Sequence, residues 1–178
     1  QSVLMLPVGV DHPDAPALQV FSHILGDSQL SSRLAKELRE KKALVYGFGR
    51  NLSLNGRTDV GALTIAANYT AGRGDQVSAA VHKVLQSLVD QGITVQELEA
   101  AKADMLKARV TMMEDERNIH RMLVSQLELG KTMLDREKRD KAIAQLTTDE
   151  VNRVIRKYIK PQHMVEVMSD QYAKNDTL

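Results

Sequence analysis

The chain has 178 residues, 43% of them hydrophobic, which is enough for one domain with a substantial core. Its 24 basic and 23 acidic residues leave a net charge of +1, which gives no long-range attraction to nucleic acid or to an anionic membrane surface. The absence of cysteine excludes disulfides, thiolate zinc sites and cysteine nucleophiles. No apolar run approaches the roughly 20 residues of a membrane span.

The first part of the chain predicts a strand followed by two helices. The strand covers 2–10, and because it begins at the first residues without an initiator Met, we expect the chain to be cut from a longer protein. The second helix covers about 30–41. The apolar stripes at helical spacing are Leu18, Phe21 and Leu25 in the first helix, and Leu30, Leu34 and Leu38 in the second.

A hairpin is predicted next, with strands at 43–54 and 59–70. Asn55-Gly56 is expected to form its turn, because both residues tolerate positive φ. Alternation places Leu44, Tyr46 and Phe48 on one face of the first strand. One face of the second strand is formed by Gly61, Leu63, Ile65, Ala67 and Tyr69.

The remaining chain is predicted to be helical from Asp75, its expected N-cap, until Pro161, and to close with a strand at 164–168. Capping boxes at Thr94-x-x-Glu97 and Thr147-x-x-Glu150 open two of the helices, and Gly92 ends an earlier one. A short helix is expected at 135–144, with the alternating charges of 136–141 on a solvated face. The predicted buried stripes are Val77, Ala80, Val81, Val84, Leu85 and Leu88; Leu98, Ala101, Met105, Ala108 and Met112; Ile119, Met122, Leu123 and Leu127; and Val151, Val154, Ile155, Tyr158 and Ile159.

This order of elements predicts an α+β fold, in which a mostly antiparallel sheet carries several helices packed on one face. Residues 1–171 are interpreted as a single domain and residues 172–178 as a tail.

Candidate metal ligands and nucleophiles are few. The histidines are His12, His23, His82, His120 and His163. None of them forms an i, i+4 pair with another His. Glu116 and His120 are four residues apart, but they lack a third ligand. The stretch from His163 to Val167 only approaches the H-x-x-E-H pattern. His82 lies off its apolar helix face and is expected to be exposed. No serine has a G-x-S-x-G context or an evident His partner. The sequence therefore predicts no metal site and no catalytic set within the chain itself.

Arg39, at the end of a helix, and Tyr46, on the following strand, allow two interpretations. They could be a surface Arg and a strand Tyr that packs against the core. Alternatively, the guanidinium and the phenol could converge as two donors for one peptide carbonyl oxygen, which matters most when that oxygen gains negative charge.

The stretch from Ser31 to Tyr46 resembles the segment S-R-L-x-x-E-L-R-E-K-x-x-L-x-Y of the pitrilysin family of zinc metallopeptidases, which includes insulysin and the mitochondrial processing peptidase. The stretch 94–102 also resembles a family segment. Family members hold zinc in an N-terminal unit on an H-x-x-E-H helix. Because this chain lacks that motif, it is similar to the metal-free C-terminal unit.

The resemblance implies a substrate-binding domain of a zinc endopeptidase, inactive alone. Arg39 and Tyr46 would bind and polarise the scissile carbonyl of a peptide or protein substrate. The zinc would lie opposite them, in a separate domain or subunit, and this chain would carry no cofactor. A bacterial periplasmic location is the corresponding expectation. Family members often carry Gly shortly before the Tyr, whereas this chain has Ala43-Leu44-Val45. The alternative is a non-catalytic scaffold, or the inactive half of a complex.

Overall fold

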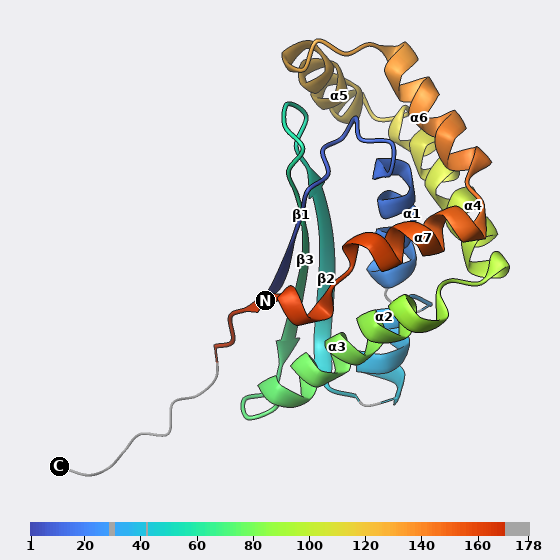
Figure 1. Cartoon of the computed structure of the whole chain (residues 1–178). Helices are drawn as coiled ribbons and strands as arrows, with labels where there is room; N and C mark the ends of the chain where they lie inside the picture. Colours follow the sequence, from blue (N-terminus) through green and yellow to red (C-terminus); the bar gives the residue numbers. More distant parts are fainter. Residues whose placement is uncertain (29–30, 42, 170–178) are drawn as a thin grey trace.

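The computed structural model describes residues 1–28, 31–41 and 43–169, which form one sheet with helices on one side of it (Figure 1). The strands are β1 (Ser2–Leu6), β2 (Val45–Leu54), β3 (Gly61–Tyr69) and β4 (Val165–Glu166), in the order β2-β3-β1-β4. Every neighbouring pair is antiparallel. The predicted α+β architecture is therefore confirmed. The expected tail, residues 172–178, lies outside the described residues.

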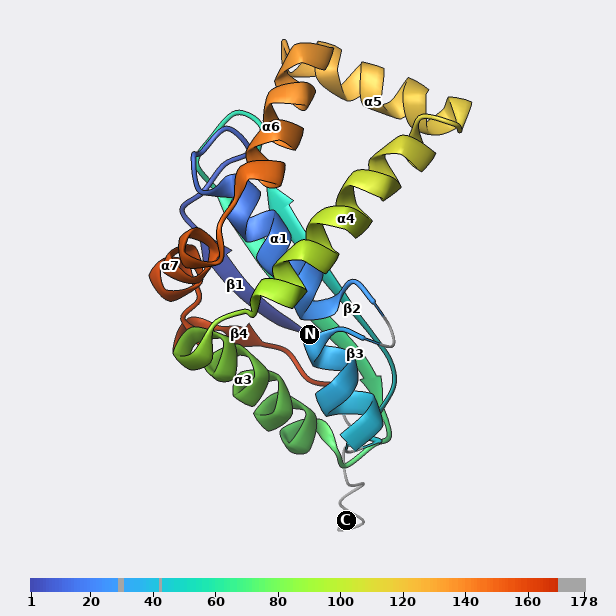
Figure 2. The same cartoon turned by 90° about the vertical axis from the view of Figure 1, so that its right-hand side faces the viewer.

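The helices form two layers over the sheet. Their bounds are α1 Ala15–Gly26, α2 Arg33–Ala35, the π-helix η1 Lys36–Lys41, α3 Gly74–Gln91, α4 Val95–Met112, α5 Glu116–Glu128, α6 Met133–Gln145, α7 Thr148–Tyr158 and the 3₁₀ turn η2 Pro161–His163. Helix α1 is the central one, because it contacts β2 on one side and α4, α6 and α7 on the other (Figures 1 and 2). Its side chains are accordingly buried almost all round the helix.

The apolar stripes of α3 and α7, the glycine that ends α3 and the capping box of α7 are confirmed. All six predicted positions of α3 are buried, and so are the predicted positions of the last helix and its end. Gly92 ends α3 with a φ of 74°, a left-handed conformation that glycine adopts without steric strain. Both capping boxes are formed, and in the first the Thr94 hydroxyl accepts a bond of 3.1 Å from the Glu97 amide.

The first and the last strand in the chain, β1 and β4, are shorter than predicted. β1 ends at Leu6, because its neighbour β3 begins at the paired residue Gly61 and leaves the following residues without a ladder partner. Only Val165 and Glu166 of the closing segment pair with β1. Within the expected helix over 30–41, the helical structure begins at Arg33, and Leu30 lies outside the described residues.

The hairpin is confirmed, but its loop is two residues longer than the gap 55–58 between the predicted strands. Residues 55–60 form a longer loop, closed by a bond of 2.8 Å from the Asn55 amide to the Val60 carbonyl. Neither Asn55 nor Gly56 has a positive φ. The Asn55 side-chain oxygen instead accepts bonds from the Arg57 and Thr58 amides, at 2.7 and 3.0 Å, so this side chain organises the loop.

The region formed by α4, α5 and α6 departs most from the predictions. Only Leu98 and Ala101 of the α4 stripe are fully buried, and α5 contains no fully buried residue. In Figure 2, α5 bridges the outer ends of α4 and α6, away from the sheet, so no second layer covers its apolar side chains. Arg136 is 9% exposed instead of solvated, because it points between these helices.

Asp75 is also not the cap of α3, since Arg73 occupies that position and Asp75 lies in the first turn. Within the described part of the chain, no helix combines the length and the apolar character needed to cross a membrane.

Candidate functional site

Arg39 lies on the π-helical segment η1, which follows the short helix α2. The hydroxyl of Ser32 caps α2 by accepting a bond of 3.3 Å from the Ala35 amide. Leu34 and Leu38 are fully buried and anchor the segment, whereas Arg39 is exposed. Among the described residues, no carboxylate or carbonyl group accepts a bond from the Arg39 guanidinium. A π-helical turn is rare and is often found at functional sites.

The connection from η1 to β2 places Ala43 in a left-handed conformation, with a φ of 45°. The Ala43 amide donates to the Arg39 carbonyl at 3.2 Å, and the Leu44 amide donates to the Leu38 carbonyl at 2.8 Å. These two bonds end the π-helical segment around a left-handed residue, a position that glycine usually occupies at helix ends. The alanine therefore forms the same turn at a steric cost.

Tyr46 is turned outward by a β-bulge at the start of β2. Val45 pairs with Tyr69 and Gly47 pairs with Asn68, so Tyr46 is an extra residue without a partner in β3. The predicted shared face of Leu44, Tyr46 and Phe48 is therefore wrong. Val45 and Phe48 are buried, and Tyr46 is 77% exposed.

The Tyr46 hydroxyl pairs with the Thr70 hydroxyl at 3.0 Å, so a side chain at the end of β3 helps to orient the ring. η1 contacts both β2 and α3, which fixes the helix end against the strand that carries Tyr46. The fold thus presents two solvent-accessible hydrogen-bond donors on consecutive elements, a guanidinium and a phenol, and both can donate to a carbonyl oxygen.

The described part of the chain does not fit a zinc ion, because it contains no group of three or more His, Asp or Glu side chains that could hold a metal.

A polar cluster that the sequence did not reveal surrounds Glu166 on β4. Its carboxylate accepts bonds from the hydroxyls of Ser78, at 2.5 Å, and Ser2, at 2.8 Å, and lies 3.3 Å from Nε2 of His82. His82 is thus partly covered, contrary to the prediction. Burial by itself raises the pKa of Glu166, but the two hydroxyls and His82 outweigh it and lower the pKa. Both hydroxyls donate to a carboxylate instead of an imidazole, so the cluster does not activate a serine.

The comparison with protein families matches residues 2–105 to the peptidase M16 inactive domain. The chain is 31% identical over 163 residues to an uncharacterized zinc protease of Mycobacterium leprae, covering 91% of this chain and 36% of that protein. It is 36% identical over 97 residues to the uncharacterized zinc protease YmxG of Bacillus subtilis, covering 54% of this chain and 23% of that protein. The chain therefore spans about a third or less of these relatives.

Solved structures share the fold. A peptidase M16 inactive domain from Pseudomonas fluorescens has a TM-score of 0.78 at 22% identity, over 96% of this chain and 42% of that chain. The inactive peptidase domain of a putative zinc protease from Bordetella parapertussis has a TM-score of 0.77 at 21% identity, over 92% of this chain and 88% of that chain. The resemblance inferred from the segment Ser31 to Tyr46 is confirmed, and the chain belongs to the peptidase M16 inactive domain family.

Proposed function

We propose that this domain binds peptide substrates for a zinc endopeptidase, with Arg39 and Tyr46 holding the scissile carbonyl oxygen. The zinc would be held by a separate unit, on the same or on a partner chain. The observation that carries the proposal is the bulge, which turns Tyr46 out to 77% exposure directly after a helix end that presents Arg39. A buried Tyr46 would have favoured a packing role.

The chemistry of the pair suits a carbonyl that gains charge. The Arg39 guanidinium offers several N–H donors, and the Tyr46 phenol can donate its single O–H to the substrate while it accepts a bond from the Thr70 hydroxyl. Donors directed at a developing oxyanion stabilise the transition state more than the ground state, provided that water is excluded. A unit closing over this surface would exclude that water. The role of this chain is limited to binding and polarising the oxygen.

The test replaces Tyr46 in the protein that unites this domain with its zinc-bearing unit. Tyr46→Phe removes one hydroxyl, so kcat on a quenched peptide should fall by about 10- to 1,000-fold, the range observed for the loss of one oxyanion donor. Zinc content, measured by metal analysis, should not change.

Tyr69→Phe is the matched control. It makes the same chemical change in the adjacent strand, where the Tyr69 hydroxyl is buried and makes no hydrogen bond within the described residues. Its kcat should equal that of the wild type. If Tyr46→Phe behaves like Tyr69→Phe in an active enzyme, Tyr46 is not an oxyanion donor. A wild-type protein that neither binds zinc nor cleaves peptides would instead establish the scaffold role.

A further inference from the structure

A second solvent-accessible space lies at the hairpin end of the sheet, between the β2–β3 loop and the helices α4, α5 and α6. It is a cavity of about 510 Å³, lined by apolar side chains and by Arg109, Lys131, Arg136 and Arg139. Among the residues that the structure describes, no acidic side chain lines it. Since β2 runs for 10 residues, roughly 25 Å of strand separates this cavity from Tyr46. The cavity is therefore a separate feature from the Arg39–Tyr46 surface.

Arg136 is the most deeply placed of the four cations, with 9% of its surface exposed. One guanidinium nitrogen contacts the Met122 sulfur, which is a weak acceptor, and another donates to the Arg109 carbonyl at 3.4 Å. Among the described residues, no carboxylate forms an ion pair with Arg136. A buried guanidinium in this situation is energetically unfavourable unless an anion or water occupies the space beside it.

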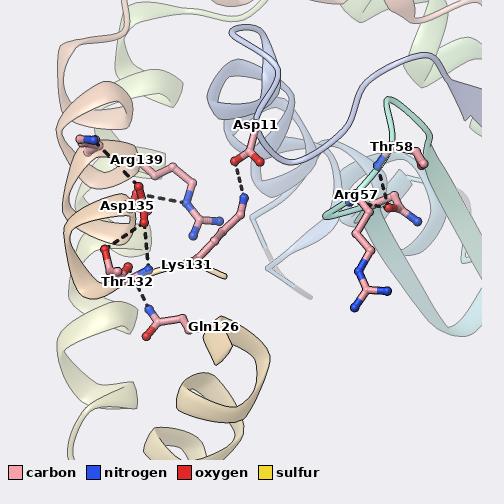
Figure 3. Close-up of polar contacts among 10 residues, drawn as sticks. Asp11, Arg57, Thr58, Gln126, Lys131, Thr132, Asp135 and Arg139 are labelled. Atoms are coloured by element: carbon pink, nitrogen blue, oxygen red, sulfur yellow. Dashed lines mark hydrogen bonds and ion pairs between the residues drawn. The ribbon is translucent and has the colours of Figure 1, made fainter. Parts of the chain in front are cut away.

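Arg139 lies one turn along the same helix, so both side chains point from one face of α6. Its Nε donates to the Asp135 carbonyl at 3.4 Å, and no carboxylate pairs with it within the described part of the chain. In Figure 3 the Arg139 guanidinium extends beside Lys131, whose amine is paired with Asp11. Lys131 is well covered, with 11% of its side chain exposed.

The charges around the cavity do not balance. Asp140 pairs with Arg109, and Asp11 pairs with Lys131, which leaves Arg136 and Arg139 without a compensating carboxylate among the described residues. The positive charges of Arg136 and Arg139 act on the neighbouring guanidinium of Arg109. Burial lowers the pKa of Arg109, Asp140 opposes this change, and the charges of Arg136 and Arg139 lower the pKa further.

We propose that this cavity binds a small anion that carries two or more carboxylate or phosphate groups. Guanidinium groups bind both kinds of oxyanion through paired, charge-assisted hydrogen bonds. The volume falls within the ordinary range for small-molecule pockets, which is about 300–1,000 Å³. The two guanidinium groups that lack a carboxylate partner would hold the charges of the ligand, and the apolar lining would contact any carbon skeleton that it carries.

The test is isothermal titration calorimetry of the 178-residue chain with citrate and with pyrophosphate at constant ionic strength. We expect saturable binding of at least one of them to a single site. Arg139→Gln should weaken binding by about 10- to 100-fold, the loss expected for hydrogen bonds to a charged group. Lys138→Gln is the matched control, because it removes the same charge from the adjacent residue, whose side chain is 80% exposed and does not line the cavity.

Arg136→Met supplies a second, independent readout. It removes the buried charge while keeping an unbranched apolar side chain, so it should abolish binding without lowering Tm in ligand-free buffer. Stronger binding of citrate than of pyrophosphate would assign a carboxylate ligand, and the reverse a phosphate ligand. The proposal is overturned if neither anion binds saturably, or if Lys138→Gln weakens binding as much as Arg139→Gln does.

Discussion

At the residue scale, a single inserted residue determines the chemistry of the candidate site. Without the bulge, strict alternation would place Tyr46 on the same face as Phe48, which is buried. With the bulge, Val45 and Phe48 both reach the core and Tyr46 reaches solvent. Bulges often reorient a side chain next to a functional site, and this one converts a core tyrosine into an accessible hydrogen-bond donor.

Ala43 yields a prediction at the same scale. Its φ of 45° costs an L-amino acid about 1–2 kcal/mol, a strain that glycine does not experience. Glycine increases the entropy of the unfolded chain by an amount worth about 0.4–1 kcal/mol. Ala43→Gly should therefore raise the free energy of unfolding by about 0.5–1 kcal/mol, measured by urea denaturation.

Ala79→Gly is the control for this substitution. Ala79 is an exposed residue in the interior of α3, where glycine should lower the free energy of unfolding by about 1 kcal/mol. If the two variants are destabilised equally, the left-handed conformation of Ala43 is not strained in solution.

At the element scale, the start of α1 is joined to α7 by one buried carboxylate. Asp14 accepts bonds from Arg153 at 2.6 Å, Lys157 at 3.0 Å and the Tyr158 hydroxyl at 2.9 Å. Burial by itself raises the pKa of Asp14, but these three donors outweigh it and hold the pKa far below its ordinary value. The contact therefore ties two helices that are far apart in the chain.

Asp14→Asn should lower the free energy of unfolding by about 1–3 kcal/mol at neutral pH, because the donors lose a charged acceptor. The pKa is depressed in the folded state, so the stabilisation is complete above the unfolded pKa of about 4 and is lost as the pH falls below it. Urea denaturation from about pH 7 to pH 3 should show the wild type approaching the variant at acidic pH.

Asp59→Asn serves as the comparison, since Asp59 is exposed and has no partner among the described residues. It should change the unfolding free energy by less than about 0.5 kcal/mol at any pH in this range. A gap between wild type and Asp14→Asn that stays constant down to pH 3 would contradict the assigned role of Asp14.

At the scale of the whole molecule, the packing is uneven. The sheet, α1, α3 and α7 enclose the main core, whereas α5 has no fully buried residue and stands at the outer ends of α4 and α6 (Figure 2). A region with few buried apolar contacts opens at a lower free energy than the core. The anion cavity lies in this region, so a bound ligand would add contacts where the fold itself has few.

Two leucine truncations should report this difference. Leu88 of α3 is 1% exposed, so Leu88→Ala should lower the free energy of unfolding by about 2–5 kcal/mol. Leu127 of α5 is 83% exposed, so Leu127→Ala should change it by no more than about 0.5 kcal/mol. Both variants replace Leu by Ala in a helix, so the change in helix propensity is the same in each. Chemical denaturation of the two variants measures the free energies of unfolding. Similar losses would show that α5 is covered in solution.

The sequence by itself determined the features that depend on neighbours along the chain. The stripe of α3, the glycine at its end and the capping boxes were predicted correctly, because helical spacing and end signals are local. The segment from Ser31 to Tyr46 was sufficient to identify the family. The lack of an H-x-x-E-H motif indicated which of the family's two units this chain resembles.

Only the tertiary structure decided which side chains face solvent. The orientation of Tyr46 depends on how β2 pairs with β3. Leu127 is exposed because no layer of the described fold covers its side of α5. Arg136 is buried because α4 and α5 lie on either side of it. None of these neighbours is adjacent in sequence. The spacing of apolar residues and the capping signals depend on residues close together in the sequence. Burial and charge pairing arise only when distant segments pack together.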